Sequence, residues 1–140
     1  VTFSIAFYLA KLAKKHGAKM IHFACLLFGA ISFLWFPTIQ NQYVFFAVII
    51  GYGIAWASMM GIPYLMVVAV IPKERYGVYM GIINMMIVIP MIIQNLSFGY
   101  ILKNFLDNDP RQAISFAGVL LMLAAICTLL IKIKNTKVSE

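Results

Sequence analysis

Long apolar runs alternate with short polar segments along the whole chain. The long runs cover about residues 20–36, 43–71, 76–102 and 113–131, and a shorter apolar run occupies residues 1–10. A helix crosses a bilayer with roughly 17 to 25 predominantly apolar residues, so the long runs predict membrane-spanning helices. Residues 1–10 would reach only about 15 Å as a helix, which predicts a partial span and a chain that is a C-terminal fragment. The predicted fold class is all-α, a polytopic transmembrane helix bundle.

The two longest runs form a predicted hairpin about the polar segment 72–77. Pro63 lies in the second half of the first run, and Pro90 lies near the middle of the second run. Proline removes a backbone donor from a helix, so we expect a kink at Pro63.

Composition supports a membrane protein. The chain is 64% hydrophobic and 11% charged, which leaves too little polar surface to cover a soluble domain. The net charge of +7 does not indicate a nucleic-acid interface, because the basic residues lie in clusters between apolar runs.

Cys25 and Cys127 fall inside apolar runs and are interpreted as packing residues. No metal site or cofactor is predicted.

The basic residues also predict an orientation. If polar segments alternate between the two sides, Lys103 and Arg111 lie on one side, together with Asp107 and Asp109. The opposite side carries Lys11, Lys14, Lys15, Lys19, Lys73, Arg75, Lys132, Lys134 and Lys137. The positive-inside rule then places loops 11–19 and 72–76 and the C-terminal tail in the cytoplasm of a multi-pass protein of the inner or plasma membrane.

No Asp, Glu, Lys or Arg lies in the middle of any predicted span. Such residues mark proton and ion relays, so a relay is expected outside this sequence. His22 follows Lys19 by one helical turn and is interpreted as an interfacial residue without function. We find no paired carboxylates, metal-ligand cluster or nucleophile with a base, and therefore predict no enzyme.

Aromatic residues in the third run share one helical face. Tyr52, Trp56 and Pro63 recur at about helical spacing. This face suits either lipid contact and bundle packing or the wall of a substrate cavity, in which a ring stacks on an apolar face of a solute. Tyr64 belongs to the same wall or to a gate.

Small residues form a second stripe on that run, at Gly53, Ala57 and Gly61. Stripes of this kind allow close helix packing. The same expectation applies to Gly77 and Gly81.

Asn84 and Asn95 point to the same side of the fourth run, because eleven residues are close to three helical turns. An amide in lipid is unfavourable without a partner, so both side chains should face protein or water. Packing against another helix and contact with a solute both remain open.

The order of these features resembles the C-terminal half of a major facilitator superfamily transporter, from the end of helix 8 to helix 12 of twelve. Segments 56–64 and 77–90 resemble the branch that contains sucrose and related disaccharide proton symporters. Segment 10–19 resembles the cytoplasmic signature Gly-x-Leu-Ala-Asp-x-x-Gly-Arg-Lys. Lys14 replaces its acidic residue, and Ala10 replaces its first glycine.

The resemblance implies secondary active transport, with proton-coupled uptake of a sugar or disaccharide by alternating access. The proton-binding carboxylate would lie in the missing N-terminal half, which would be a partner together with lipid, substrate and protons. The implied cavity candidates are Tyr52, Trp56, Tyr64, Asn84 and Asn95. The cytoplasmic gating candidates are Lys14, Lys15, Gly17, Glu74, Arg75 and Gly77. Alternatives are a carrier of a drug, nucleoside or organic anion, and a small non-transporting membrane subunit.

Overall fold

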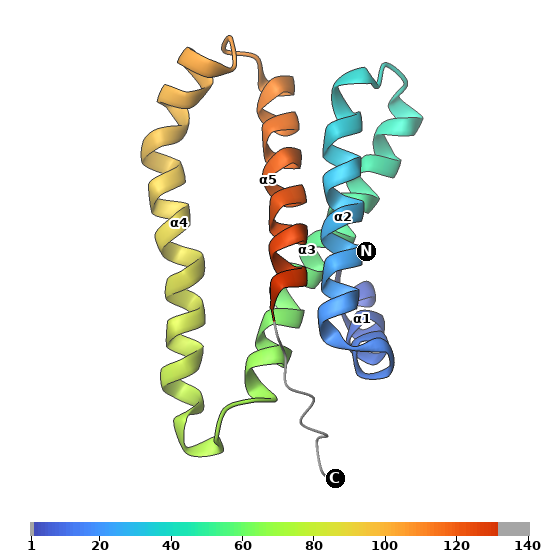
Figure 1. Cartoon of the computed structure of the whole chain (residues 1–140). Coiled ribbons are helices and arrows are strands. Elements are labelled where there is room, and N and C mark those ends of the chain that lie inside the picture. The colour runs from blue at the N-terminus through green and yellow to red at the C-terminus, as the bar shows by residue number, and fades with distance from the viewer. Residues whose placement is uncertain (1, 132–140) are drawn as a thin grey trace.

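The computed structural model describes residues 2–131, which fold into helices joined by short turns (Figure 1). The described part of the chain contains no strand. Its elements are α1 (Thr2–His16), α2 (Ala18–Trp35), the 3₁₀ turn η1 (Phe36–Thr38), α3 (Gln42–Val68), the 3₁₀ turn η2 (Lys73–Arg75), α4 (Tyr76–Phe105) and α5 (Pro110–Leu130). Lys132, Lys134 and Lys137 of the predicted cytoplasmic tail lie outside the described residues.

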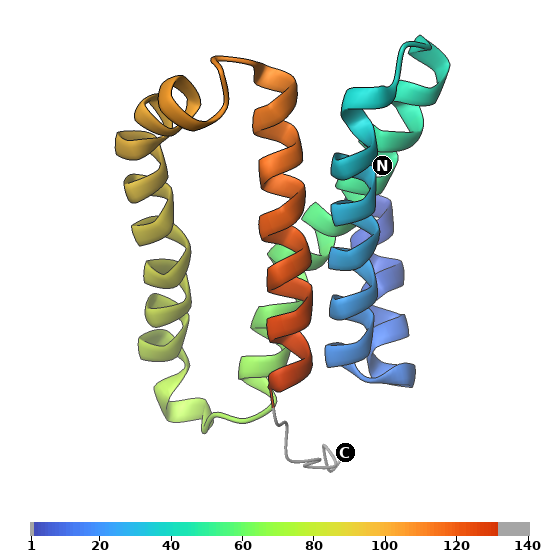
Figure 2. The same cartoon turned by 45° about the horizontal axis from the view of Figure 1, so that its top comes forward.

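The helices run up and down between two ends of the bundle (Figures 1 and 2). One end holds the α1–α2 turn, η2 and the end of α5, and the other holds η1 and the α4–α5 loop. Four segments are long and apolar enough to cross a membrane: Ala18–Thr38, Gln42–Val68, Lys73–Phe105 and Pro110–Leu130. The predicted all-α transmembrane bundle is therefore confirmed.

Helix α1 continues through most of the basic segment that was expected to be a loop. Residues 11–16 are helical, and the chain turns at Gly17, whose φ is 90°. Lysine, leucine and alanine are good helix formers, so nothing ends α1 before a glycine that can adopt a positive φ. The prediction of a loop over residues 11–19 is wrong in this respect.

The loops before α3 and before α5 each supply a cap for the helix that follows. Asn41 Oδ1 accepts a hydrogen bond from the Tyr43 backbone N–H at 2.9 Å, and Asp109 Oδ1 accepts one from Arg111 N–H at 2.8 Å. These side chains satisfy backbone donors that the first turns of α3 and α5 leave free.

Pro63 lies inside α3 and Pro90 lies inside α4, and both helices continue past the proline.

Helix α2 is the centre of the packed part of the bundle, since α1, α3 and α5 all pack against it. A methyl group added at Gly29 would collide with Cβ of Ala55, and one added at Gly51 would collide with Ser32. A methyl group at Gly118 would lie 3.1 Å from atoms of α2. Small residues thus let α3 and α5 approach α2 closely.

The predicted small-residue stripe is only partly correct. Ala57 is buried, with 3% of its surface exposed, and packs in a cluster with Leu9 and Cys25. Gly61, Gly77 and Gly81 have open space where a side chain would stand, so they take no part in close packing among the described helices. The tight contact with α2 uses Gly51 and Ala55, two residues earlier than Gly53 and Ala57.

Helix α4 stands apart from this packed part (Figures 1 and 2). None of its residues is buried. Its packing against α3 lies beside the short η2 connection, where the two helices converge.

Candidate functional site

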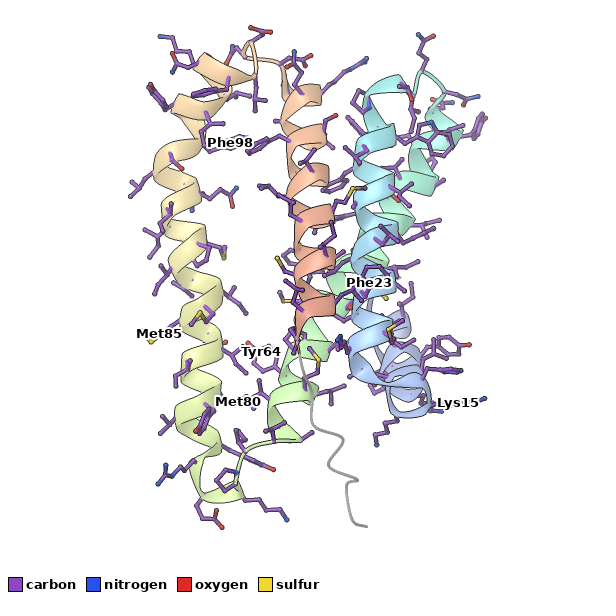
Figure 3. All side chains as sticks on the ribbon, viewed as in Figure 1. Lys15, Phe23, Tyr64, Met80, Met85 and Phe98 are labelled. Carbon is purple, nitrogen blue, oxygen red and sulfur yellow. The ribbon has the colours of Figure 1, made fainter. Side chains whose placement is uncertain are left out.

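Two of the predicted cavity residues bond to each other. The hydroxyl of Tyr64 on α3 donates to Oδ1 of Asn84 on α4 at 2.6 Å. Figure 3 shows Tyr64 directed from α3 toward α4. Tyr64 is half-buried and Asn84 is exposed, so the pair joins two helices at the surface of the described bundle.

Two other candidates belong to an aromatic cluster. The rings of Tyr52 and Trp56 lie 5.9 Å apart at an angle of 40°. Phe33 of α2 stacks on Tyr52, with ring centroids 4.9 Å apart. Tyr52 therefore packs between its neighbours, whereas Trp56 remains 43% exposed and presents part of its indole ring outside the packed helices.

The five cavity candidates do not form one cluster. Tyr52 and Tyr64 are separated by about 18 Å along α3, and Asn84 and Asn95 by about 16 Å along α4, at 1.5 Å per helical residue. Asn95 is exposed, and no hydrogen bond links its side chain to another described residue. The structure pairs Tyr64 with Asn84 and Tyr52 with Trp56, and leaves Asn95 apart from both pairs.

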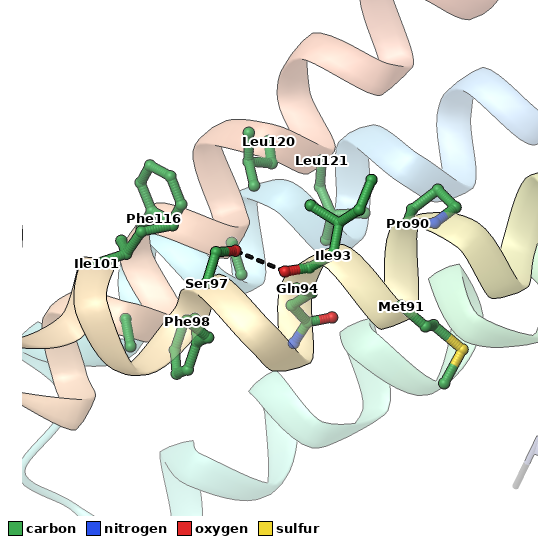
Figure 4. A pocket seen from close by; sticks show the side chains of 12 residues that line it. Pro90, Met91, Ile93, Gln94, Ser97, Phe98, Ile101, Phe116, Leu120 and Leu121 are labelled. Atoms are coloured by element: carbon green, nitrogen blue, oxygen red, sulfur yellow. Dashed lines mark hydrogen bonds between the residues drawn. The ribbon is translucent and has the colours of Figure 1, made fainter.

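A groove lies between α4 and α5 (Figure 4). Its volume of about 650 Å³ falls in the range of small-molecule sites. Gln94 and Ser97 are its polar residues, and the Ser97 hydroxyl donates to the Ile93 carbonyl at 2.6 Å. The remaining lining is apolar: Pro90, Met91, Ile93, Phe98, Ile101, Ala113, Phe116, Ala117, Leu120 and Leu121.

The predicted gating residues gather at one end of the bundle. Lys14 and Lys15 are exposed at the end of α1, and Glu74 and Arg75 are exposed in η2; Lys15 is labelled in Figure 3. Gly17 forms the α1–α2 turn, and Gly77 lies in the first turn of α4. Within residues 2–131, no ion pair links Glu74 or Arg75 to another helix.

Lys19 joins α2 to α5 at this end of the bundle. Its ammonium group donates to the carbonyl of Leu129, near the end of α5, at 2.8 Å. A cation is favourable there, because the last carbonyls of a helix carry partial negative charge.

His22 lies near the start of α2, and its side chain is buried against α3. Only 8% of its surface is exposed, and its Nδ1 lies 2.7 Å from Oγ of the fully buried Ser58 on α3. The sequence did not indicate this contact, because position along a span does not reveal which face of a helix meets its neighbour.

The family model described as the Major Facilitator Superfamily matches residues 1–139. The chain belongs to this superfamily. No curated protein and no solved structure matches the chain. Members of the superfamily are transporters that move small molecules across membranes, so membership favours a transporter over an enzyme or a non-transporting subunit.

Some residues of this major facilitator transporter were not identified from sequence. Hydrophobic periodicity does not show which helices are neighbours. The roles of Phe33, Ser58 and the α4–α5 groove follow from those neighbours and were therefore missed. Gly51 and Ala55 do carry a signal, since their spacing is that of a small-residue packing motif. Among the described residues no group of three or more His, Cys, Asp or Glu side chains is placed to hold a metal ion.

Proposed function

We propose that this chain is part of the C-terminal half of a proton-coupled sugar transporter that works by alternating access. The observation that carries the proposal is the Tyr64–Asn84 hydrogen bond. Asn84 accepts through its carbonyl oxygen, and its amide nitrogen can still donate to a sugar hydroxyl. A phenol and an amide on two different helices therefore offer polar contacts that change when α3 and α4 move relative to each other.

The exposed part of Trp56 supports a sugar as the solute. An indole ring offers an apolar face and one N–H donor, which suits a sugar ring whose faces are apolar and whose edges carry hydroxyls. Tyr52 holds the indole from one side. In this proposal Trp56 stacks on the sugar, and Tyr52 positions it.

Proton coupling is assigned to the other half of the transporter. Between residues 2 and 131, carboxylates occur at Glu74, Asp107 and Asp109, all within the polar connections. The membrane-embedded carboxylate expected of a proton-coupled carrier would come from the N-terminal half. The basic end of the bundle faces the cytoplasm in this arrangement.

The α4–α5 groove favours a second candidate function. Its lining is mostly apolar, with Gln94 and Ser97 as polar contacts, which suits an apolar or amphipathic solute such as a drug. A major facilitator carrier of such a solute is the alternative.

Uptake by the full-length transporter tests the proposal. It is expressed in cells that lack sugar uptake, and accumulation of labelled disaccharide is measured under an imposed pH gradient. Gradient-dependent accumulation is the expected result. Transport of an amphipathic drug without any disaccharide would instead establish the alternative.

The variant Trp56→Ala tests the role of the indole. Transport should fall much further than the yield of folded protein. Trp35→Ala is the matched control, since Trp35 is exposed at the end of α2 and should retain transport. Equal losses of transport and folded yield at Trp56 would assign it to packing.

A further inference from the structure

A buried polar pair connects α2 and α3 close to the basic end of the bundle. His22 lies in the second turn of α2, and its Nδ1 is 2.7 Å from Ser58 Oγ. Ser58 has no exposed surface and His22 has 8%. The pair is therefore enclosed by packed helices, and the established role of the superfamily does not assign it a task.

A proton on the imidazole would disturb this enclosed arrangement. Neutral histidine has one N–H donor and one acceptor nitrogen, so it can exchange a hydrogen bond with the Ser58 hydroxyl in either direction. Protonated histidine has two donors and no acceptor. Ser58 Oγ would then have to accept the bond and turn its own hydrogen toward another group.

The charge itself has no counter-ion in the packed helices. No Asp or Glu occurs in α1, α2, α3 or α5. On α2 the titratable neighbours of His22 are Lys19 and Cys25; α3 contributes Tyr64, which bonds to Asn84, and α5 contributes the exposed Cys127. The lysines and His16 of α1 are exposed. An isolated charge is unfavourable in such surroundings and is stabilised by contact with water.

From this geometry we infer that His22 and Ser58 form a proton-sensitive latch between α2 and α3. The neutral imidazole holds the helices together. Uptake of a proton favours an arrangement in which the helices separate at this end and water reaches the ring. Ser58 is two residues from Trp56 and six from Tyr64, so opening of the latch displaces the helix that carries the candidate solute contacts.

The two native cysteines allow a direct test that requires no transport. Cys25 lies one turn beyond His22 and is 6% exposed, whereas Cys127 on α5 is exposed. The purified transporter is treated with dithiodipyridine, which reacts with thiols in acid and at neutral pH, and labelling at each cysteine is measured by mass spectrometry. The ratio of Cys25 to Cys127 labelling then reports separation of the helices.

The expected result is a Cys25 to Cys127 ratio that increases as pH falls from about 8 to about 5, the range in which histidine titrates. If one proton is bound only in the open form, the increase approaches about tenfold per pH unit in the acid part of this range. His22→Gln keeps a polar side chain without titration, and its ratio should not change with pH. His16→Gln removes the exposed histidine and should respond as the wild type does.

Two results overturn the latch. One is a Cys25 to Cys127 labelling ratio of the wild type that does not depend on pH. This result contradicts the latch even if His22→Gln fails to fold. The other is a ratio that still increases in His22→Gln or His22→Asn. Failure of sugar uptake would leave this readout unchanged, so the latch and the proposed substrate are tested separately.

Discussion

Tyr64 and Asn84 are 20 residues apart in the chain, and a hydrogen bond of 2.6 Å joins them across the turn between α3 and α4. No residue of α4 is buried, so α4 has little apolar packing within the described bundle. The Tyr64–Asn84 hydrogen bond therefore contributes strongly to the angle between α3 and α4.

Removal of the Tyr64 hydroxyl should weaken this connection. We expect Tyr64→Phe and Asn84→Ala each to destabilise the protein, and the double variant to lose less than the sum of the two. The coupling free energy should be about 1 kcal/mol, the net contribution of one hydrogen bond. It is obtained from the unfolding free energies of the four proteins in detergent. Strict additivity would show that the bond does not form in the folded protein.

Any side chain at Gly29 should destabilise the packing of α2 on α3. Gly29→Ala places a methyl group against Ala55, and the resulting separation of α2 and α3 should lower the unfolding free energy by about 1 to 3 kcal/mol. Gly81→Ala is the matched control because open space surrounds Gly81. It should be neutral or stabilising by up to about 1 kcal/mol, through its higher helix propensity. Equal destabilisation by both substitutions would contradict the observed packing of α2 on α3.

Lys19 should stabilise the contact between α2 and α5 through its bond to the Leu129 carbonyl. Lys19→Met keeps much of the aliphatic chain and removes the donor, and we expect a loss of about 1 kcal/mol in unfolding free energy. Lys15→Met removes an exposed lysine from the same end of the bundle and should have little effect. A Lys15→Met protein as destabilised as Lys19→Met would indicate a general effect of net charge.

The basic end of the bundle should face the cytoplasm. Single cysteines at Lys73 and at Asp107 lie at opposite ends. In intact cells a membrane-impermeant maleimide should label Asp107→Cys, and Lys73→Cys should react only after the membrane is permeabilised. The reverse pattern would invert the orientation expected from the positive-inside rule.

The apolar runs predicted the helices to within a few residues, because span length and polar connections are local properties of a chain. The runs at 43–71 and 76–102, for example, correspond to α3 at Gln42–Val68 and α4 at Tyr76–Phe105. The end of α1 was missed, since a cluster of lysines suggests a loop although lysine is a good helix former. Gly17 marks the turn more reliably than the charges do.

Contacts between helices were much less predictable. Gly51 with Ala55 and Gly53 with Ala57 satisfy the same spacing, and the sequence offers no means of choosing between them. The burial of His22 depends on Ser58, 36 residues later in the chain. Asn84 was recognised as a candidate because polar groups in apolar runs need partners, and Tyr64 because it follows the aromatic face of its run. Their bond to each other followed only from the structure.

The packing of α5 on α2 has a consequence for synthesis of the protein. Gly118 of α5 fits against Phe33 and Leu34 of α2, yet α3 and α4 are made between these two helices. Chains emerge from the ribosome with the N-terminus first, so α2 is made before α5 and cannot form this contact until α5 is inserted. A chain that stopped before Pro110 would therefore leave α2 without this neighbour, and quality-control proteases would encounter an unpartnered membrane helix.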